Sequence, residues 1–226
     1  MKYAVLDWDN TIRKGYTIFS FVDFLISESV LPWSVKQSID EWDQKYRSGQ
    51  ITHDQYAQYA CQDFADSLSG HSVSSVNNLV KEYIRFDRQN LFSFSKTLFD
   101  FLHKYDIAPI VISGAPLCVI REYREEFHIQ EIYAFEVSQH LGKYTGAVNS
   151  NYGYGKDDII SELIKKYRVP PFMGFGDSSS DYPLMQASQY GFCIGKDYAT
   201  NSIANTTFIS QDATETDISP ILLRCL

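Results

Sequence analysis

The 226-residue sequence lacks the features that mark several large classes of protein. Its four cysteines lie far apart and form no C-x-x-C pair, which argues against a zinc site or a disulfide framework and fits a reducing compartment. No block of lysine and arginine stands out, and the net charge of −8 disfavours a general surface for nucleic acid or anionic lipid. No apolar run approaches the roughly 18 residues of a membrane span.

The remaining composition is that of a globular protein. Hydrophobic residues make up 44% of the chain, which is enough for the core of one large domain or two small ones. Charge at Asp7 interrupts the N-terminal region, so we expect no secretory signal peptide and a cytoplasmic location. We predict a soluble protein, monomer or homodimer, that neither enters a membrane nor binds nucleic acid.

Short apolar runs with the length of buried parallel strands recur along the chain. They lie at residues 3–6, 108–112, 172–175, 191–194 and 207–209, with helical patterns at residues 92–105, 116–127 and 156–167. This alternation predicts βαβ units and a parallel sheet in a three-layer, Rossmann-like α/β core. Alternating residues at 135–139 and 143–148, around Leu141-Gly142, predict a β-hairpin attached to that core.

The first two predicted strands are separated by an unusually long segment. It has about 100 residues, whereas a βαβ crossover needs only about 30. Its apolar residues predict helices at residues 17–28, 34–47, 52–69 and 73–84, with Thr52 and Ser72 as N-caps. We therefore predict an all-helical cap at residues 14–88, inserted after the first strand, on an α/β core of residues 1–13 and 89–226.

Polar residues directly follow three of the predicted strands. In an open α/β sheet, ligands bind beyond the carboxyl ends of the strands, so we expect these groups to converge on one site. Each group taken alone has a structural alternative: an Asx turn for Asp7 and Asp9, a helix N-cap, then favoured, for the Ser113 segment, and a polar loop for the Asp177 segment. The residues are Asp7 and Asp9 after the first strand, Ser113 and Gly114 after the second, and Asp177 after a third, with Asp181 one turn later.

Lys156 begins the helix predicted at residues 156–167. A cation is unfavourable at a helix N-terminus unless an anion also lies there, as phosphate often does. A solvated lysine is the alternative interpretation. Lys143 is a second candidate for a phosphate-binding lysine, but hairpin lysines usually lie at the surface.

Four segments together resemble a known family. DWDNT at residues 7–11, the SGAP turn at 113–116, Lys156 and GDSSSD at 176–181 match, in order and spacing, the four motifs of the haloacid dehalogenase-like superfamily. The resemblance covers the whole α/β core. The position of the helical cap, and the hairpin that ends at residues 142–146, are similar to the phosphoserine-phosphatase-like branch.

The resemblance implies a phosphatase that works through an aspartyl-phosphate, with Asp7 as the nucleophile and Asp9 as the general acid and base. A phosphomonoester carries about two negative charges, so a carboxylate nucleophile needs a cation beside it, and the resemblance implies Mg²⁺. The two carboxylates need different pKa values, because one attacks while ionised and the other donates a proton.

The resemblance also implies the ligands of this site. The Mg²⁺ ligands would be Asp7, the backbone carbonyl of Asp9, and Asp177, with Asp181 supporting through water or orientation. The phosphoryl oxygens would be held by Ser113, the backbone N–H of Gly114, and Lys156. Asn10, Thr11 and Ser178 would support the loops.

The substrate is expected to be a small phosphorylated metabolite other than phosphoserine. Phosphoserine phosphatases place a glutamate a few residues beyond the first motif, whereas residues 12–17 here contain no acid. Arg13 and Lys14 are interpreted as exposed hinge charges, with an anionic substrate group as the alternative. Most cap aromatics should form the cap core, and any that line the cleft would suit an apolar or quaternary-ammonium leaving group. The aromatics are Phe19, Phe21, Phe24, Trp33, Trp42, Tyr46, Tyr56 and Tyr59.

Other functions stay open at this point. A phosphotransferase or mutase would pass the phosphoryl group to a second hydroxyl. A signalling receiver also combines acidic residues with lysine, but it carries the phosphorylated aspartate after its third strand. The dehalogenases of the superfamily lack the second aspartate, so Asp9 favours phosphate chemistry. A silent binding protein is disfavoured because no motif position is missing.

Overall fold

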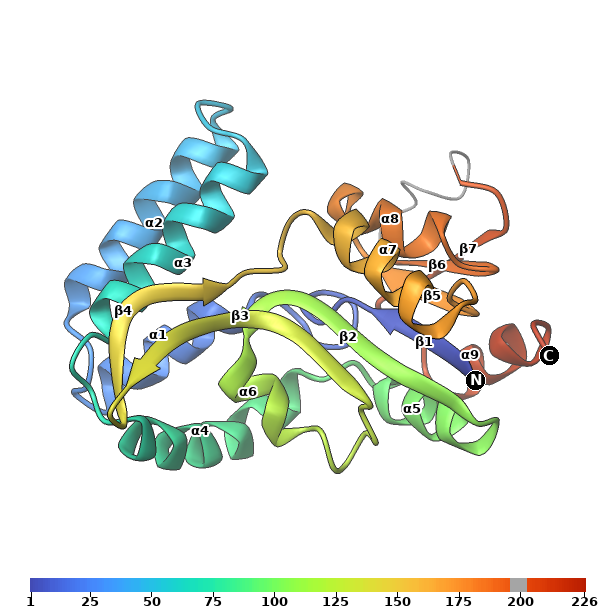
Figure 1. Ribbon diagram of the computed structural model, residues 1–226, viewed down its shortest axis with the longest axis horizontal. Helices are drawn as coiled ribbons and strands as arrows, with labels where there is room; N and C mark the ends of the chain where they lie inside the picture. Colours follow the sequence, from blue (N-terminus) through green and yellow to red (C-terminus); the bar gives the residue numbers. More distant parts are fainter. Residues whose placement is uncertain (196–202) are drawn as a thin grey trace.

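The computed structural model describes residues 1–195 and 203–226. Its centre is a seven-stranded sheet with the order β4-β3-β2-β1-β5-β6-β7 (Figure 1). Neighbouring strands are parallel except β3 and β4, which confirms the predicted α/β fold. The strands are β1 (Lys2–Leu6), β2 (Ile107–Pro116), β3 (Glu131–His140), β4 (Lys143–Ser150), β5 (Met173–Gly176), β6 (Tyr190–Ile194) and β7 (Thr206–Ile209).

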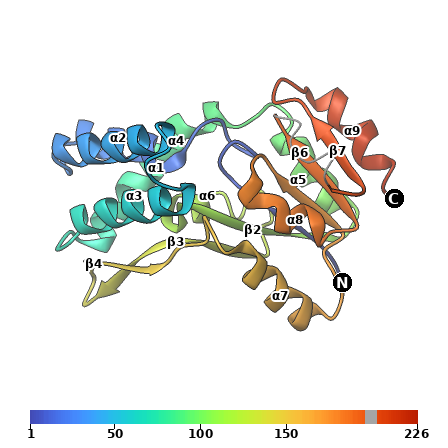
Figure 2. The ribbon, with the colours of Figure 1, turned by 90° about the horizontal axis from the view of Figure 1, so that it is seen from above.

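Helices cover both faces of the parallel sheet (Figure 2). Alternate residues of β1 point to opposite faces, as strand geometry requires. Tyr3 and Val5 join a cluster with residues of α7 (Lys156–Tyr167) and α8 (Tyr182–Gln186). Ala4 and Leu6 join the larger cluster, which includes residues of α5 (Ser95–Lys104) and α9 (Glu215–Leu223). The three-layer prediction is therefore confirmed, and β1 is buried on both sides.

Four helices, here called the cap helices, lie between β1 and β2 in the sequence and at one end of the sheet in space (Figure 1). They are α1 (Thr17–Ser27), α2 (Trp33–Arg47), α3 (His53–Ser67) and α4 (Val73–Asp87). Thr52 and Ser72 cap α3 and α4 as predicted, Thr52 through a reciprocal capping box with Gln55. The division of the chain at residues 13/14 and 88/89 stays a prediction.

The hairpin connects the sheet to the cap helices. β3 pairs with β2, so the hairpin is an extension of the main sheet, with β4 as its antiparallel edge. The α3–α4 loop pairs with the hairpin through three backbone hydrogen bonds of 2.9–3.0 Å. They run from Gly70 N to Tyr144 O, from Val73 N to Gly142 O, and from Tyr144 N to His71 O. The cap helices are thus attached to the core at the hairpin as well as through the chain connections.

A buried ion pair joins the two chain connections between core and cap helices. Arg13 lies in the first connection, and its Nε donates to Asp87 Oδ1, at the end of α4, at 2.8 Å. The hydroxyls of Tyr83 and Tyr123 each donate to the Asp87 carboxylate at 2.9 Å. Arg13 is only 2% exposed, so the interpretation of Arg13 as an exposed hinge charge is wrong, whereas Lys14 is exposed.

The helix predicted at residues 116–127 is wrong in extent. Strand β2 continues through Ser113 to Pro116, which pairs with Phe135 after a register shift, so Ser113 is not a helix N-cap. Helix α6 covers only Leu117–Glu122. The following turn is closed by Arg124, whose side chain donates to the carbonyl oxygens of residues 129 and 130. Within the described ranges, no helix is both long and apolar enough to cross a bilayer.

We expect Arg13→Met to lower the free energy of unfolding by about 3–5 kcal/mol, because the variant leaves the Asp87 carboxylate buried without its cation. The double variant Arg13→Met/Asp87→Leu should recover part of that loss. Urea unfolding followed by circular dichroism measures both.

The exposed pair Lys96–Asp100 is the matched control, since its partners are two-thirds solvent-accessible and an exposed pair contributes little. Lys96→Met should therefore leave the midpoint nearly unchanged. Equal midpoints for Arg13→Met and Lys96→Met would contradict a structural role for the buried pair.

Candidate active site

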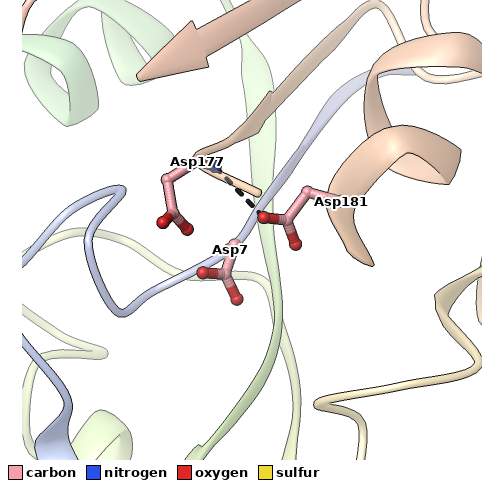
Figure 3. A group of neighbouring side chains, drawn as sticks. All are labelled: Asp7, Asp177 and Asp181. Atoms are coloured by element: carbon pink, nitrogen blue, oxygen red, sulfur yellow. Dashed lines mark hydrogen bonds between the residues drawn. The ribbon is translucent and has the colours of Figure 1, made fainter. Parts of the chain in front are cut away.

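Three carboxylates meet beyond the carboxyl ends of β1 and β5. Asp7 directly follows β1, Asp177 directly follows β5, and Asp181 ends the short helix η2 (Ser179–Asp181). Figure 3 shows the three side chains facing a common space, and one oxygen of each lies within 4.8 Å of the others. They are adjacent because β1 and β5 pair side by side in the sheet.

Lys156 supplies the positive charge at this cluster. Its Nζ lies 2.7 Å from Asp7 Oδ1 and 2.6 Å from Asp181 Oδ1, and the side chain is buried. Burial lowers the pKa of Lys156, but attraction to Asp181 and Asp7 outweighs it and raises the pKa above its usual value. Lys156 therefore stays charged, and the interpretation of this residue as a solvated lysine is wrong. Lys143, the competing candidate, is exposed on β4.

Asp181 is held by donors on both of its oxygens. Oδ1 accepts from Lys156, while Oδ2 accepts from the backbone N–H groups of Asp177 at 3.1 Å and Ser178 at 3.0 Å, and from the Ser178 hydroxyl at 3.0 Å. Gly176 allows this packing, because a Cβ there would lie 2.2 Å from Asp181 Cβ. Through these hydrogen bonds, Asp181 orients the loop that carries Asp177.

Asp9 connects the loop after β1 with the first cap helix. Its carboxylate accepts hydrogen bonds from the backbone N–H of Thr17, at 3.0 Å, and from the Thr17 hydroxyl. Burial raises the pKa of Asp9 to about 7, although the bonds from Thr17 and the charge of Arg13 oppose the shift. The pKa of Asp9 therefore lies near neutral pH, unlike the pKa of an ordinary surface aspartate.

Asn10 helps to fix the loop between Asp9 and α1. Asn10 has a left-handed backbone with φ of +58°, and its Oδ1 accepts the N–H of Gly15 at 2.9 Å. Gln211 donates to the Asn10 carbonyl oxygen at 3.2 Å from the far end of the sheet. The Thr11 hydroxyl is buried and has no hydrogen-bond partner among the described residues, so its geometry shows no orienting bond.

Ser113 and Gly114 lie beside Asp7 on the neighbouring strand. Ser113 Oγ accepts the N–H of Ala115 at 3.2 Å, so its own proton is available to a ligand. A Cβ on Gly114 would lie 3.0 Å from the Cα of Gly153, which shows how closely the two loops approach. The loop before α7 thus requires small residues on both sides to bring Lys156 into the site.

These groups open into one cavity of about 550 Å³ between the sheet edge and the cap helices. Of the site residues predicted from sequence, only Thr11 and Asp181 lie behind its wall. The predicted residues that line it are Asp7, Asp9, Asn10, Ser113, Gly114, Lys156, Asp177 and Ser178. Sequence reasoning missed the lining residues Tyr16, His53, Asp54, Cys61, Asn151, Gly153 and Gln211 as site components. Only Gly153, close to Lys156, carried a signal in the sequence.

The cluster holds more negative charge than Lys156 neutralises. Burial raises the pKa of Asp7 to about 6, against the opposing effect of Lys156. Burial, with repulsion from Asp181 and Asp7, raises the pKa of Asp177 to about 9. Within the described chain, no donor hydrogen-bonds the Asp177 carboxylate. An oxygen-only donor set with surplus negative charge fits a hard divalent cation such as Mg²⁺.

The fold and the site together define an α/β enzyme whose catalytic groups lie at the carboxyl ends of parallel strands, under inserted helices. The particular family follows from comparison with known proteins. The model of the haloacid dehalogenase-like hydrolases matches residues 4–186, so this chain belongs to that family. The prediction of a hydrolase of this superfamily is confirmed. No curated protein sequence matches the chain.

Solved structures share the whole fold at low sequence identity. A protein with unknown function from Bordetella pertussis Tohama I is 18% identical, with a TM-score of 0.75 over 93% of this chain and 98% of that chain. A phosphoserine phosphatase solved as a phospho-aspartyl intermediate analogue is 14% identical, with a TM-score of 0.65 over 99% of both chains. Cytosolic 5'-nucleotidase IIIB bound to cytidine is 16% identical, with a TM-score of 0.68 over 99% of this chain and 84% of that chain. The predicted placement in the phosphoserine-phosphatase-like branch is confirmed at the level of fold.

We expect Asp177→Asn to have opposite effects on stability without and with Mg²⁺. The pKa of Asp177 is raised from about 4 in the unfolded chain to about 9 in the folded protein. The wild-type protein therefore loses stability as the pH rises between these two values. At pH 8 in chelator, Asp177→Asn should thus be more stable than the wild type. Saturating Mg²⁺ should stabilise the wild type, by about 2.7 kcal/mol at a hundredfold excess over Kd, and the variant much less.

Thermal unfolding at pH 8, with chelator and with Mg²⁺, measures both effects. Asp40→Asn, an exposed aspartate of α2, is the matched control and should behave as wild type. An equal Mg²⁺ shift in wild type and Asp177→Asn would contradict this cation site.

Proposed function

We propose that this protein is a Mg²⁺-dependent phosphatase that hydrolyses a small phosphomonoester through a phosphoryl-aspartate at Asp7. The observation that carries the proposal is the convergence of Asp7, Asp9, Asp177 and Lys156 on one cavity of about 550 Å³. Family membership supports a hydrolase, and the phosphatases among the structural neighbours support phosphate as the group transferred.

Asp7 is the proposed nucleophile. Its carboxylate oxygen attacks phosphorus, the new O–P bond forms, and the bond from phosphorus to the leaving oxygen breaks. Lys156, 2.7 Å from Asp7, favours the ionised carboxylate that the attack requires. The Lys156 ammonium, the Ser113 hydroxyl and the backbone N–H of Gly114 would bind the phosphoryl oxygens as their charge redistributes.

Asp9 is the proposed acid and base. It donates a proton to the leaving alkoxide in the first step, then takes a proton from the water that hydrolyses the phosphoryl-aspartate. A group that performs both tasks works best with a pKa near the operating pH, and the pKa of Asp9 is about 7. The bonds from Thr17 favour its ionised form, and burial favours its protonated form.

Mg²⁺ would be held by Asp7, the backbone carbonyl of Asp9, and Asp177, with Asp181 orienting the loop. When bound, it would neutralise charge between the carboxylates and the phosphoryl group. The surplus negative charge of the described cluster supports this assignment.

A phosphotransferase or mutase would use the same residues and differ only in the acceptor. It is separated by whether inorganic phosphate is released without an added alcohol. The receiver alternative is disfavoured, because a receiver needs no cavity lined by inserted helices beside its aspartate, and Asp9 would have no task there.

Inorganic phosphate release from a panel of small phosphomonoesters tests the proposal directly. We expect release that requires Mg²⁺, stops with chelator, and falls at least about a thousandfold in Asp7→Asn, because the variant lacks the nucleophile. Folding of the variant is checked by circular dichroism, and Asp40→Asn is the control. No release by folded wild type with Mg²⁺, with or without an acceptor alcohol, would overturn the proposal.

The role of Asp9 predicts a dependence on the leaving group. Asp9→Asn should slow hydrolysis of an alkyl phosphate by about 10²–10⁴, because an alkoxide leaves poorly without a proton. p-Nitrophenyl phosphate has a leaving group that needs no proton, so Asp9→Asn should slow the first step much less with this ester. Burst kinetics separate that step from hydrolysis of the intermediate, and equal loss of the first step on both esters would exclude Asp9 as the acid.

A further inference from the structure

The cap side of the cavity is formed by a continuous group of rings, here called the aromatic wall. Its members are Tyr16, Phe19, Tyr46, His53 and Tyr56. The rings of Tyr46 and Tyr56 stack with their centroids 5.4 Å apart and 7° between their planes. The centroid of the Phe19 ring lies 6.3 Å from that of Tyr56 and 5.4 Å from that of Tyr16. Phe21 and Phe24 pack inside the cap and Trp33 lies on its surface, so these three do not contribute to the wall.

The charges around the aromatic wall are negative. Asp54, whose side chain is 69% exposed, lines the cavity beside His53, and the carboxyl groups of Asp9 and Asp177 lie on the opposite side. Lys156 is the sole lysine or arginine among the described lining residues, and it is already bound by two carboxylates. Arg47, near the wall, is bonded to Asp43 at 2.5 Å, and its side chain is 73% exposed. Among the described lining residues, an anionic leaving group would therefore find no lysine or arginine that is free of a carboxylate partner.

The phenols of the wall are uncharged at neutral pH. Burial, followed by the charges of Asp177 and Asp9, raises the pKa of Tyr16 to about 12, and burial raises the pKa of Tyr56 further. The contributions of Asp177 and Asp9 apply to Tyr16, whereas the carboxylate that acts on Tyr56 is Asp43. The π faces of neutral aromatic rings attract cations and provide little attraction for anions.

We propose that the aromatic wall binds the ammonium group of the leaving alcohol, so that the substrates are phosphate esters of ammonium alcohols. The proposal rests on the proposed function, since it assigns the leaving group of that reaction. The phosphate end lies at Asp7 and Ser113, and the cation lies against Tyr46 and Tyr56. The cavity volume of about 550 Å³ is within the range for small-molecule sites, roughly 300–1,000 Å³. A neutral aromatic group could also stack here, but it would gain nothing from Asp54.

The test compares two esters of the same shape. Phosphocholine carries a trimethylammonium group, and 3,3-dimethylbutyl phosphate replaces its nitrogen by carbon. We expect kcat/KM to favour phosphocholine by at least about tenfold, since a partly desolvated cation–π site has that effect. Equal rates on the two esters, or a preference for cytidine monophosphate over both, would overturn the proposal.

Variants of the wall sharpen this comparison. Tyr46→Leu and Asp54→Asn should each reduce the preference for phosphocholine over the neutral ester by about two- to fivefold. Trp33→Leu is the matched control, because Trp33 is an aromatic residue of the same cap that is 58% exposed and outside the cavity. A preference that survives both wall variants unchanged would place the cation elsewhere.

Two further measurements separate failure of this inference from failure of the proposed function. Release of phosphate from p-nitrophenyl phosphate without preference for phosphocholine would overturn the inference alone. Absence of release from every ester would overturn the phosphatase. Calorimetric titration with tetramethylammonium chloride tests the wall without catalysis: binding that Tyr46→Leu weakens supports the wall, and no binding by wild type contradicts it.

Discussion

The candidate active site is dominated by electrostatic repulsion among the carboxylates that surround the buried Lys156. Asp7, Asp177 and Asp181 come from the ends of adjacent elements, and Lys156 neutralises only part of their charge. Burial makes this charge costly, which is visible in the raised pKa values of Asp7 and Asp177. The fold maintains the cluster because β1, on which Asp7 depends, is buried on both faces and paired with β2 and β5. The surplus charge is the physical basis for proposing a cation there.

Asp9 connects this site to the cap helices through hydrogen bonds from Thr17. Its carboxylate is bonded to Thr17, the first residue of α1, so the proposed acid is positioned by the element that encloses the cavity. Arg13 and Asp87 fix the two chain connections, and the hairpin pairs with the α3–α4 loop on the other side. The end of the α2–α3 pair that carries the connecting loop projects away from the sheet (Figure 1). Tyr46, near the end of α2, and Asp54, near the start of α3, line the cavity. The proposed catalytic residues and the proposed aromatic wall thus lie on differently anchored parts of the chain.

Several features of the fold and site were predictable because their signals are local. Apolar runs of strand length end in Asp7, Ser113 and Asp177, and parallel strands bring their carboxyl ends to one edge. The capping of α3 by Thr52 is also local, since the partner Gln55 is three residues away. Prediction failed where distant contacts decide: the helix predicted at residues 116–127 covers only Leu117–Glu122, and β2 continues to Pro116, which pairs with Phe135 of β3.

The sequence by itself determined the chemistry available at the site, through the identities of Asp7, Asp9, Lys156 and Asp177 and their positions after strand-forming runs. Only the tertiary structure decided which charges are compensated. Arg13 forms an ion pair with Asp87, 74 residues away, rather than with a ligand. Which cap aromatics form the wall was also a tertiary outcome, because the packing of the cap helices decides whether a ring faces the core or the cavity. Burial and partner choice depend on contacts between segments far apart in the chain, and these set both the pKa values and the shape of the cavity.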